Sequence, residues 1–157
     1  MHAEWLDEPS LPEPLTNNAV AGLTIDGTLY LFSFMGLDAT KTPAGITRRA
    51  FAFDTRTRRW TPIHPVPGRL GRIAATAQGV DERVYILGGY TVALDGHEVS
   101  VPNVDIYDPQ RDRYDAGAPV PVPVDDSVSG IWRDRFIYLI SGWSQQDNVP
   151  NVQVYDT

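Results

Sequence analysis

The sequence predicts an all-β protein that is built from a repeat of roughly 50 residues. Thirteen glycines and 13 prolines are spread among short apolar runs, and such punctuation is typical of many strands joined by turns. No segment of helical length keeps its apolar residues at a 3.6-residue period, so we expect almost no helix. With 42% hydrophobic and 21% charged residues, the chain has the composition of a globular domain.

Three kinds of residue mark the repeat. Tyrosines at the centre of apolar tetrads lie 55 and 53 residues apart, and aromatic residues after polar turns lie 55 and 54 apart. Aspartates close a third set of apolar runs at a similar interval. The three series are Tyr30, Tyr85 and Tyr138; Trp5, Trp60 and Tyr114; and Asp54, Asp108 and Asp156. A repeat of this length is typical of the blades of a β-propeller.

Each repeat divides into four predicted strands, which we call a to d. Strand a is rich in small residues, which suits an inner position, and strand b is centred on the repeated tyrosine. Strand c ends at the repeated aspartate, and strand d begins at Trp60 or Tyr114. The predicted a strands are 18–25, 73–79 and 127–132, and the predicted c strands are 49–54, 103–108 and 151–156. The long segments between strands b and c are expected to form loops on one rim, where binding residues tend to lie.

The middle repeat carries the most specific motifs. It contains Leu87-Gly88-Gly89 and, at 104–109, the run Val-Asp-Ile-Tyr-Asp-Pro, while the first repeat supplies Trp60. These features resemble the kelch repeat, and the resemblance covers essentially the whole chain. The first repeat departs from it with Ser-Phe at 33–34 in place of the double glycine, and the third with Ser-Gly at 141–142. The resemblance implies a β-propeller of four-stranded antiparallel blades around a central channel.

The predicted strands add up to three blades that are divided between the two ends of the chain. Residues 1–15 are expected to form an orphan outer strand d, 16–67 blade 1, 68–123 blade 2, and 124–157 strands a to c of blade 3. Three blades cannot close a ring, because propellers typically use four to eight. Either two copies form a homodimeric six-bladed ring, each N-terminal strand completing the partner's last blade, or further blades follow in a longer chain.

Alignment of the repeats on their tyrosines places Asn17, Arg72 and Asp125 at equivalent positions, and likewise Met35, Tyr90 and Trp143. We expect these positions to surround the channel mouth, where aromatic faces and fixed polar groups suit a sugar. In the alternative interpretation, Arg72 pairs with Asp125 or Asp126 and ties blades together. The candidate ligand-binding residues are Asn17, Asn18, Arg72, Tyr90, His97, Asp125, Asp126 and Trp143.

Composition excludes several classes of function. The net charge of −7, without clustered basic residues, argues against a nucleic-acid partner, and no apolar run is long enough to span a membrane. The absence of cysteine removes thiol catalysis and cysteine-ligated zinc. The three histidines lie in separate segments, so we expect no metal site and no cofactor. Residues 1–5 lack the features of a secretory signal, which leaves cytoplasm and periplasm both open.

The resemblance implies two functions. Kelch-like propellers commonly act as binding scaffolds, which would hold a ligand or protein partner at the channel mouth and the long loops. The alternative is a carbohydrate-active isomerase of the sialic acid epimerase (mutarotase) kind. An oxidase of the galactose oxidase kind is excluded, because its cofactor needs a cysteine crosslinked to a tyrosine and this chain has no cysteine.

Overall fold

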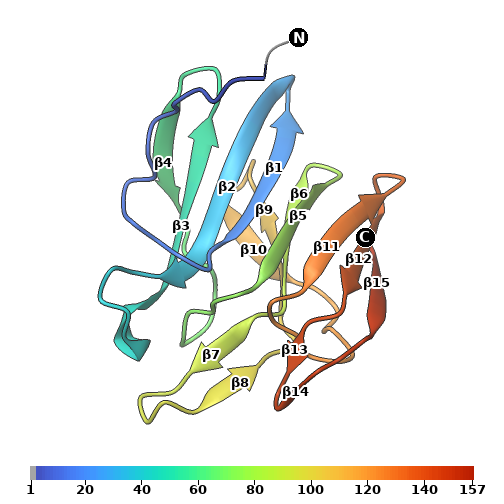
Figure 1. Cartoon of the computed structure of the whole chain (residues 1–157). Helices are drawn as coiled ribbons and strands as arrows, with labels where there is room; N and C mark the ends of the chain where they lie inside the picture. Colours follow the sequence, from blue (N-terminus) through green and yellow to red (C-terminus); the bar gives the residue numbers. More distant parts are fainter. Residues whose placement is uncertain (1–2) are drawn as a thin grey trace.

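The computed structural model describes residues 3–157 and contains three antiparallel sheets of three or four strands that follow one another along the chain (Figure 1). The first sheet is β1 (Ala19–Ile25), β2 (Thr28–Leu37), β3 (Ile46–Asp54) and β4 (Arg59–Ile63). The second is β5 (Thr76–Val80), β6 (Arg83–Leu87), β9 (Val104–Asp108) and β10 (Arg113–Ala116). The third is β11 (Val128–Trp132), β12 (Phe136–Ile140) and β15 (Val152–Asp156). The all-β class and the a-b-c-d strand order of the first two repeats are therefore confirmed.

Turn chemistry explains why the chain reverses where it does. Asp26 and Gly27 join β1 to β2 with φ of 47° and 75°, and two positive φ values are the signature of a tight type I′ hairpin turn. After β3, the Asp54 carboxylate accepts hydrogen bonds from the backbone N–H groups of Arg56 and Thr57 at 2.8 and 3.1 Å. Asp108 does the same after β9. The repeated aspartates at 54 and 108 thus hold the turn between the third and fourth strands.

The segments expected to be long loops contain short hairpins in the second and third repeats. These are β7 (Tyr90–Val92) with β8 (Glu98–Ser100), and β13 (Trp143–Ser144) with β14 (Asp147–Asn148). In the first repeat the same segment holds a short 3-10 helix, Pro43–Gly45. All three lie at the same end of the sheets, as the lower part of Figure 1 shows. The fold therefore gathers the irregular parts of the chain on one rim.

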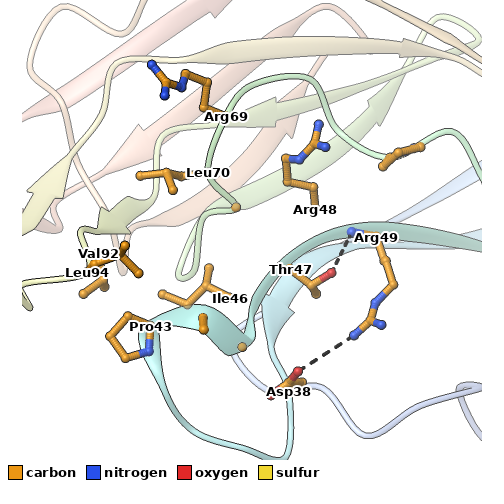
Figure 2. A pocket seen from close by; sticks show the side chains of 14 residues that line it. Asp38, Pro43, Ile46, Thr47, Arg48, Arg49, Arg69, Leu70, Val92 and Leu94 are labelled. Atoms are coloured by element: carbon orange, nitrogen blue, oxygen red, sulfur yellow. Dashed lines mark hydrogen bonds and ion pairs between the residues drawn. The ribbon is translucent and has the colours of Figure 1, made fainter.

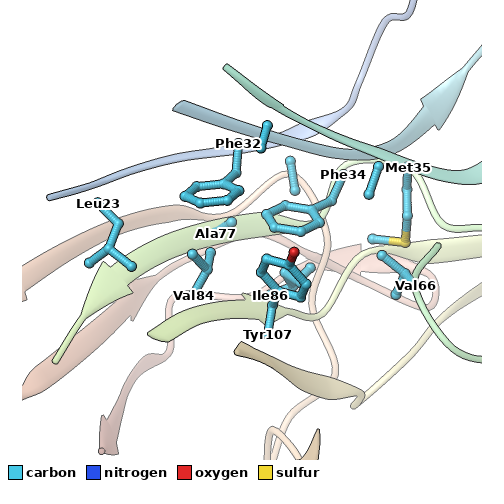
Figure 3. Packing of buried hydrophobic residues seen from close by; sticks show 12 residues of the cluster. Leu23, Phe32, Phe34, Met35, Val66, Ala77, Val84, Ile86 and Tyr107 are labelled. Atoms are coloured by element: carbon cyan, nitrogen blue, oxygen red, sulfur yellow. The ribbon is translucent and has the colours of Figure 1, made fainter. Parts of the chain in front are cut away.

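The hydrophobic cores lie between the sheets, because each central strand has two apolar faces. In β6, Val84 and Ile86 point into a cluster with Phe32 and Phe34 of the first sheet (Figure 3). The alternate residues of β6, Tyr85 and Leu87, belong to a second cluster, shared with the third sheet. A strand points successive side chains to opposite faces, so one five-residue strand contributes to both cores.

The segment predicted as an orphan outer strand forms no strand within the described residues, which exclude Met1 and His2. Instead it lies beside the turn and strand β4 of the first sheet. Trp60 Nε1 donates to the Pro9 carbonyl at 2.8 Å, and Arg58 pairs with Glu8 at 3.0 Å. Between residues 3 and 157, no helix has the length and apolar character needed to cross a membrane.

Arg72 and Asp105 form a buried ion pair inside the second repeat. The guanidinium Nη2 and the carboxylate Oδ2 are 2.5 Å apart, and the two residues are 4% and 8% exposed. Burial lowers the pKa of Arg72 and raises that of Asp105, while the pairing opposes both shifts. The expected pairing of Arg72 with Asp125 or Asp126 is therefore wrong. Asp105 lies on β9 and Arg72 on the link that leads into β5 of the same repeat, so the pair braces one repeat and does not join two.

Gly88 offers a test of the packing between the second and third sheets. Its φ is +63°, and a Cβ at this position would lie 2.3 Å from the Val124 carbonyl oxygen. Gly88→Ala should lower the free energy of unfolding by about 2 kcal/mol, from positive-φ strain and displacement of that carbonyl. Gly27→Ala, with φ +75° and open space around its Cβ, is the control and should cost about 1 kcal/mol. Equal losses of unfolding free energy in the two variants, measured by urea denaturation, would contradict the close approach of Gly88 to the Val124 carbonyl.

Removal of one partner from the buried ion pair should destabilise the fold more than removal of both. Asp105→Ala leaves the Arg72 guanidinium buried without its counter-charge, which should cost about 3 kcal/mol in thermal or urea unfolding. The double variant Arg72→Met with Asp105→Leu should recover most of this loss, because it replaces two charges with apolar groups. A single variant no worse than the double variant would show that the pair is unimportant for stability.

Candidate functional site

A cavity of about 190 Å³ lies between the two short hairpins on the rim. It is lined by Tyr90, Glu98, Ser100, Asp125, Asp126, Trp143 and Gln145. Isolated bridges hold its aromatic residues in place, because Tyr90 pairs with Ile73 and Trp143 pairs with Asp125 as the chain leaves each sheet. We call this the hairpin cavity. It lies on the rim at the boundary between the second and third repeats.

Ser100 and Asp125 form the buried base of the hairpin cavity. The Ser100 hydroxyl donates to Asp125 Oδ2 at 2.6 Å and accepts from the Gln145 backbone N–H at 3.1 Å. The Gln145 side chain also donates to the Ser100 carbonyl at 2.9 Å. Ser100 and Asp125 are only 4% and 3% exposed. These bonds connect the β7–β8 hairpin to the β13–β14 hairpin and fix the shape of the cavity.

The hairpin cavity is acidic and contains no basic side chain. Burial raises the pKa of Asp125, and the charges of Asp126 and Glu98 raise it further, although the bond from Ser100 opposes this. Burial and the same three carboxylates also raise the pKa of the Tyr90 hydroxyl. Aromatic faces and carboxylates both attract a positive charge. The arrangement therefore suits a cationic group better than an anion.

Four of the eight sequence-predicted site residues come together in the hairpin cavity. These are Tyr90, Asp125, Asp126 and Trp143. The other four do not line it. Asn17 is exposed, Asn18 donates to the Ser33 hydroxyl at 2.8 Å, Arg72 is paired with Asp105, and His97 lies in the turn of the β7–β8 hairpin.

The alignment at a constant distance from the tyrosine is wrong at the start of strand a. Asn17, Ala74 and Asp126 are the structural equivalents, since all three have φ between 50° and 57°. The Ala74 N–H donates to the Asn17 carbonyl, and the Asp126 N–H donates to the Ala74 carbonyl, both at 3.0 Å. This backbone chain links the three repeats where their inner strands begin. Met35 is likewise not the equivalent of Tyr90, because Leu37 is the residue that bridges Thr16 as Tyr90 bridges Ile73; Met35 is buried in the core.

Three lining residues were missed by the sequence analysis: Glu98, Ser100 and Gln145. Their segments were expected to be loops, and a loop gives no rule for which side chains share a face. Recognition of a hairpin would have provided one, because Tyr90 and Ser100 are directly opposite each other across β7 and β8. Among residues 3–157, no group of three or more histidine or carboxylate side chains is placed so that it could hold a metal ion.

Comparisons with known proteins agree with the fold. No family model matches the chain. β-Scruin of Limulus polyphemus is 26% identical over 156 residues, which is 98% of this chain and 16% of that protein. A putative F-box/kelch-repeat protein of Arabidopsis thaliana is 35% identical over 65 residues, 40% of this chain and 17% of the relative. The chain thus spans about a sixth of the length of these relatives.

The solved structure of YjhT has a TM-score of 0.67 to this chain at 21% identity, covering 88% of this chain and 37% of that one. At this identity the likeness shows the fold alone. The repeat spacing, the arrangement of the strands and the similarity to these relatives agree with one another. Together they support the resemblance to kelch-repeat proteins that the sequence predicts.

Proposed function

We propose that this chain is a kelch-repeat binding module whose hairpin cavity holds a cationic group of a protein partner. The observation that carries the proposal is the lining of the cavity, where Glu98, Asp125 and Asp126 meet Tyr90 and Trp143 without a basic side chain. A lysine or arginine side chain would place its charge among the carboxylates and its stem against the aromatic rings.

The size of the hairpin cavity favours a side chain over a free metabolite. Its volume of about 190 Å³ is below the range of about 300 to 1,000 Å³ that is usual for small-molecule sites. A single long side chain needs less room than a whole sugar. The partner would cover the rim while one of its side chains enters the cavity.

The alternative, a sugar isomerase, is supported by one feature of the same cavity. Asp125 has a raised pKa beside a second carboxylate, which is the environment of a group that exchanges protons. Arg72 was also among the candidate ligand-binding residues. Because Arg72 lies outside the cavity and is paired with Asp105, the binding module is the better supported function.

We further propose that the module assembles with a second copy into a closed ring. The outer face of the third sheet is apolar and exposed at Val128, Ile140 and Val152, which are directly opposite one another on β11, β12 and β15. The outer face of the first sheet exposes Val20, Leu29 and Leu31. Adjacent sheets within the chain pack through equivalent apolar faces, so each exposed face is suited to another sheet. Further blades of a longer chain would satisfy the same requirement.

A labelled peptide with one central arginine among glycine and serine residues tests the hairpin cavity by fluorescence anisotropy. Trp143→Ala and Glu98→Gln should each weaken its binding about fivefold, since each removes one attraction for the cation. Trp5→Ala, which removes a fully exposed tryptophan elsewhere, should leave binding unchanged. Equal binding of the neutral citrulline peptide would refute recognition of charge.

The same titration should depend on pH. Because burial raises the pKa of Asp125, this carboxylate takes up a proton at a higher pH than an exposed aspartate does. Affinity for the arginine peptide should therefore fall early as the pH is lowered from about 7 towards about 4. Asp125→Asn should bind more weakly at neutral pH and show a smaller change on acidification. An unchanged pH profile in that variant would exclude Asp125 from cation binding.

Light scattering coupled to size-exclusion chromatography tests the assembly. The chain should elute with twice the mass of its 157 residues. Ile140→Glu should shift it towards the monomer, because the substitution places a charge in the centre of the exposed apolar row. Leu94→Glu introduces the same charge on the rim, at a leucine that is 89% exposed against 45% for Ile140, and should remain dimeric. A monomer at all concentrations would eliminate closure by a second copy.

A further inference from the structure

A second, separate groove of about 550 Å³ is lined in part by Val92 and Leu94 of the β7–β8 hairpin (Figure 2). It lies between the segment that contains the 3-10 helix, the link from the first sheet to the second, and the tip of the hairpin. Three arginines line it, Arg48, Arg49 and Arg69, and we call it the arginine groove. Its apolar lining is Pro43, Ala44, Ile46, Pro65, Leu70, Val92 and Leu94.

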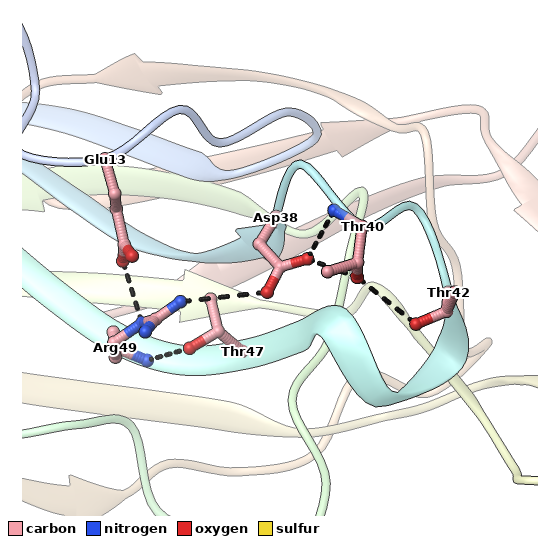
Figure 4. Close-up of polar contacts among 6 residues, drawn as sticks. All are labelled: Glu13, Asp38, Thr40, Thr42, Thr47 and Arg49. Atoms are coloured by element: carbon pink, nitrogen blue, oxygen red, sulfur yellow. Dashed lines mark hydrogen bonds and ion pairs between the residues drawn. The ribbon is translucent and has the colours of Figure 1, made fainter.

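Two of the three guanidinium groups have no carboxylate partner within residues 3–157. Arg49 is already neutralised, since its Nε lies 2.8 Å from Glu13 and its Nη2 lies 4.0 Å from Asp38 (Figure 4). Arg48 donates only to the Val66 backbone carbonyl, at 3.2 Å. Arg69 is exposed and makes no hydrogen bond or ion pair in the part of the chain that the structure describes. The groove thus carries an excess of positive charge in a chain of net charge −7.

The backbone around the arginine groove is held by close contacts. A Cβ on Gly71 would lie 2.4 Å from the Thr47 carbonyl oxygen, so the link that carries Arg69 passes directly against the start of β3. The Val66 N–H donates to the Arg48 carbonyl at 2.9 Å. These contacts fix the backbones of Arg48 and Arg69 relative to each other. A site that is already ordered loses less entropy when a ligand binds.

A buried donor without a hydrogen-bond partner lies in a cavity next to the arginine groove. A smaller cavity of about 240 Å³ shares Arg69 and Leu70 with the groove and is also lined by Arg72. One guanidinium nitrogen of Arg72 binds Asp105, but Nη1 is buried and has no hydrogen-bond partner among the described residues. Buried donors are normally satisfied, so this nitrogen marks a place for an acceptor.

We propose that the arginine groove binds an acidic peptide segment of a protein partner, in which carboxylate side chains alternate with apolar ones. Carboxylates match the fork of donors on a guanidinium, and arginine clusters are a recurrent means of recognising acidic motifs. The apolar side chains would cover Leu70 and Leu94, which are 51% and 89% exposed. The chain as a whole is negatively charged, so an acidic ligand is attracted where positive charge gathers, as it does in the groove.

A fluorescein-labelled peptide of sequence Glu-Leu-Glu-Glu-Leu-Glu tests the proposal by anisotropy on the full chain. Arg48→Gln and Arg69→Gln should each weaken binding about tenfold, since each removes a charge-assisted bond. Arg69→Lys should recover only part of this loss, because an ammonium group cannot bind a carboxylate through two parallel bonds. Arg113→Gln makes the same change of net charge on β10, outside the groove, and should bind as the parent does. Thermal unfolding of each variant confirms that the fold is retained.

The ligand class is tested by competition and substitution in the peptide. The corresponding glutamine peptide should not bind, and succinate or inorganic phosphate should compete only weakly. Trp143→Ala disables the hairpin cavity and should leave binding of the acidic peptide unchanged, which separates this proposal from the proposed function. Equal effects of Arg69→Gln and Arg113→Gln, or equal binding of succinate and the peptide, would overturn the acidic-peptide site.

Discussion

The whole structure depends on the requirement that each central strand bury both of its faces. β6 meets it by alternation, with Val84 and Ile86 in one core and Tyr85 and Leu87 in the next. Neither core belongs to a single sheet, so no sheet is a stable unit by itself. Both faces of the middle sheet are occupied by packing, so that repeat is left with its links and rim segments for binding ligands. Both candidate sites include residues of those segments.

The β7–β8 hairpin contributes residues to both candidate sites on the rim. Tyr90 and Glu98 face the acidic hairpin cavity, whereas Val92 and Leu94 line the arginine groove. Opposite charges therefore border one short hairpin, although the chain as a whole is acidic. A partner suited to this rim presents a basic side chain and an acidic segment in a defined order. Such a pattern provides orientation as well as attraction.

The sequence was sufficient for the features that follow from periodicity and turn chemistry. The repeated tyrosines and aspartates located the strands, and Asp26-Gly27, between the predicted strands a and b, is the kind of dipeptide that forms the observed hairpin turn. It was insufficient where the repeats differ in length. The segments that lead into the inner strands do not have a constant number of residues. Arg72 was therefore aligned with Asp125, although the structural counterpart of Asp125 is Ile73. The partner of Arg72 was also beyond prediction, because Asp105 meets it through packing of residues 33 positions apart.

The two exposed end faces have a thermodynamic meaning. Three sheets in an open row share two interfaces, as the two hydrophobic clusters show, whereas a closed ring has as many interfaces as sheets. When stability is a sum over units and the contacts between neighbours, closure adds a favourable interface without the conformational entropy of another unit. The middle sheet already has its full share of neighbours. Under the proposed closure, the added stabilisation would therefore fall on the first and third sheets, whose exposed faces would each gain a neighbouring sheet.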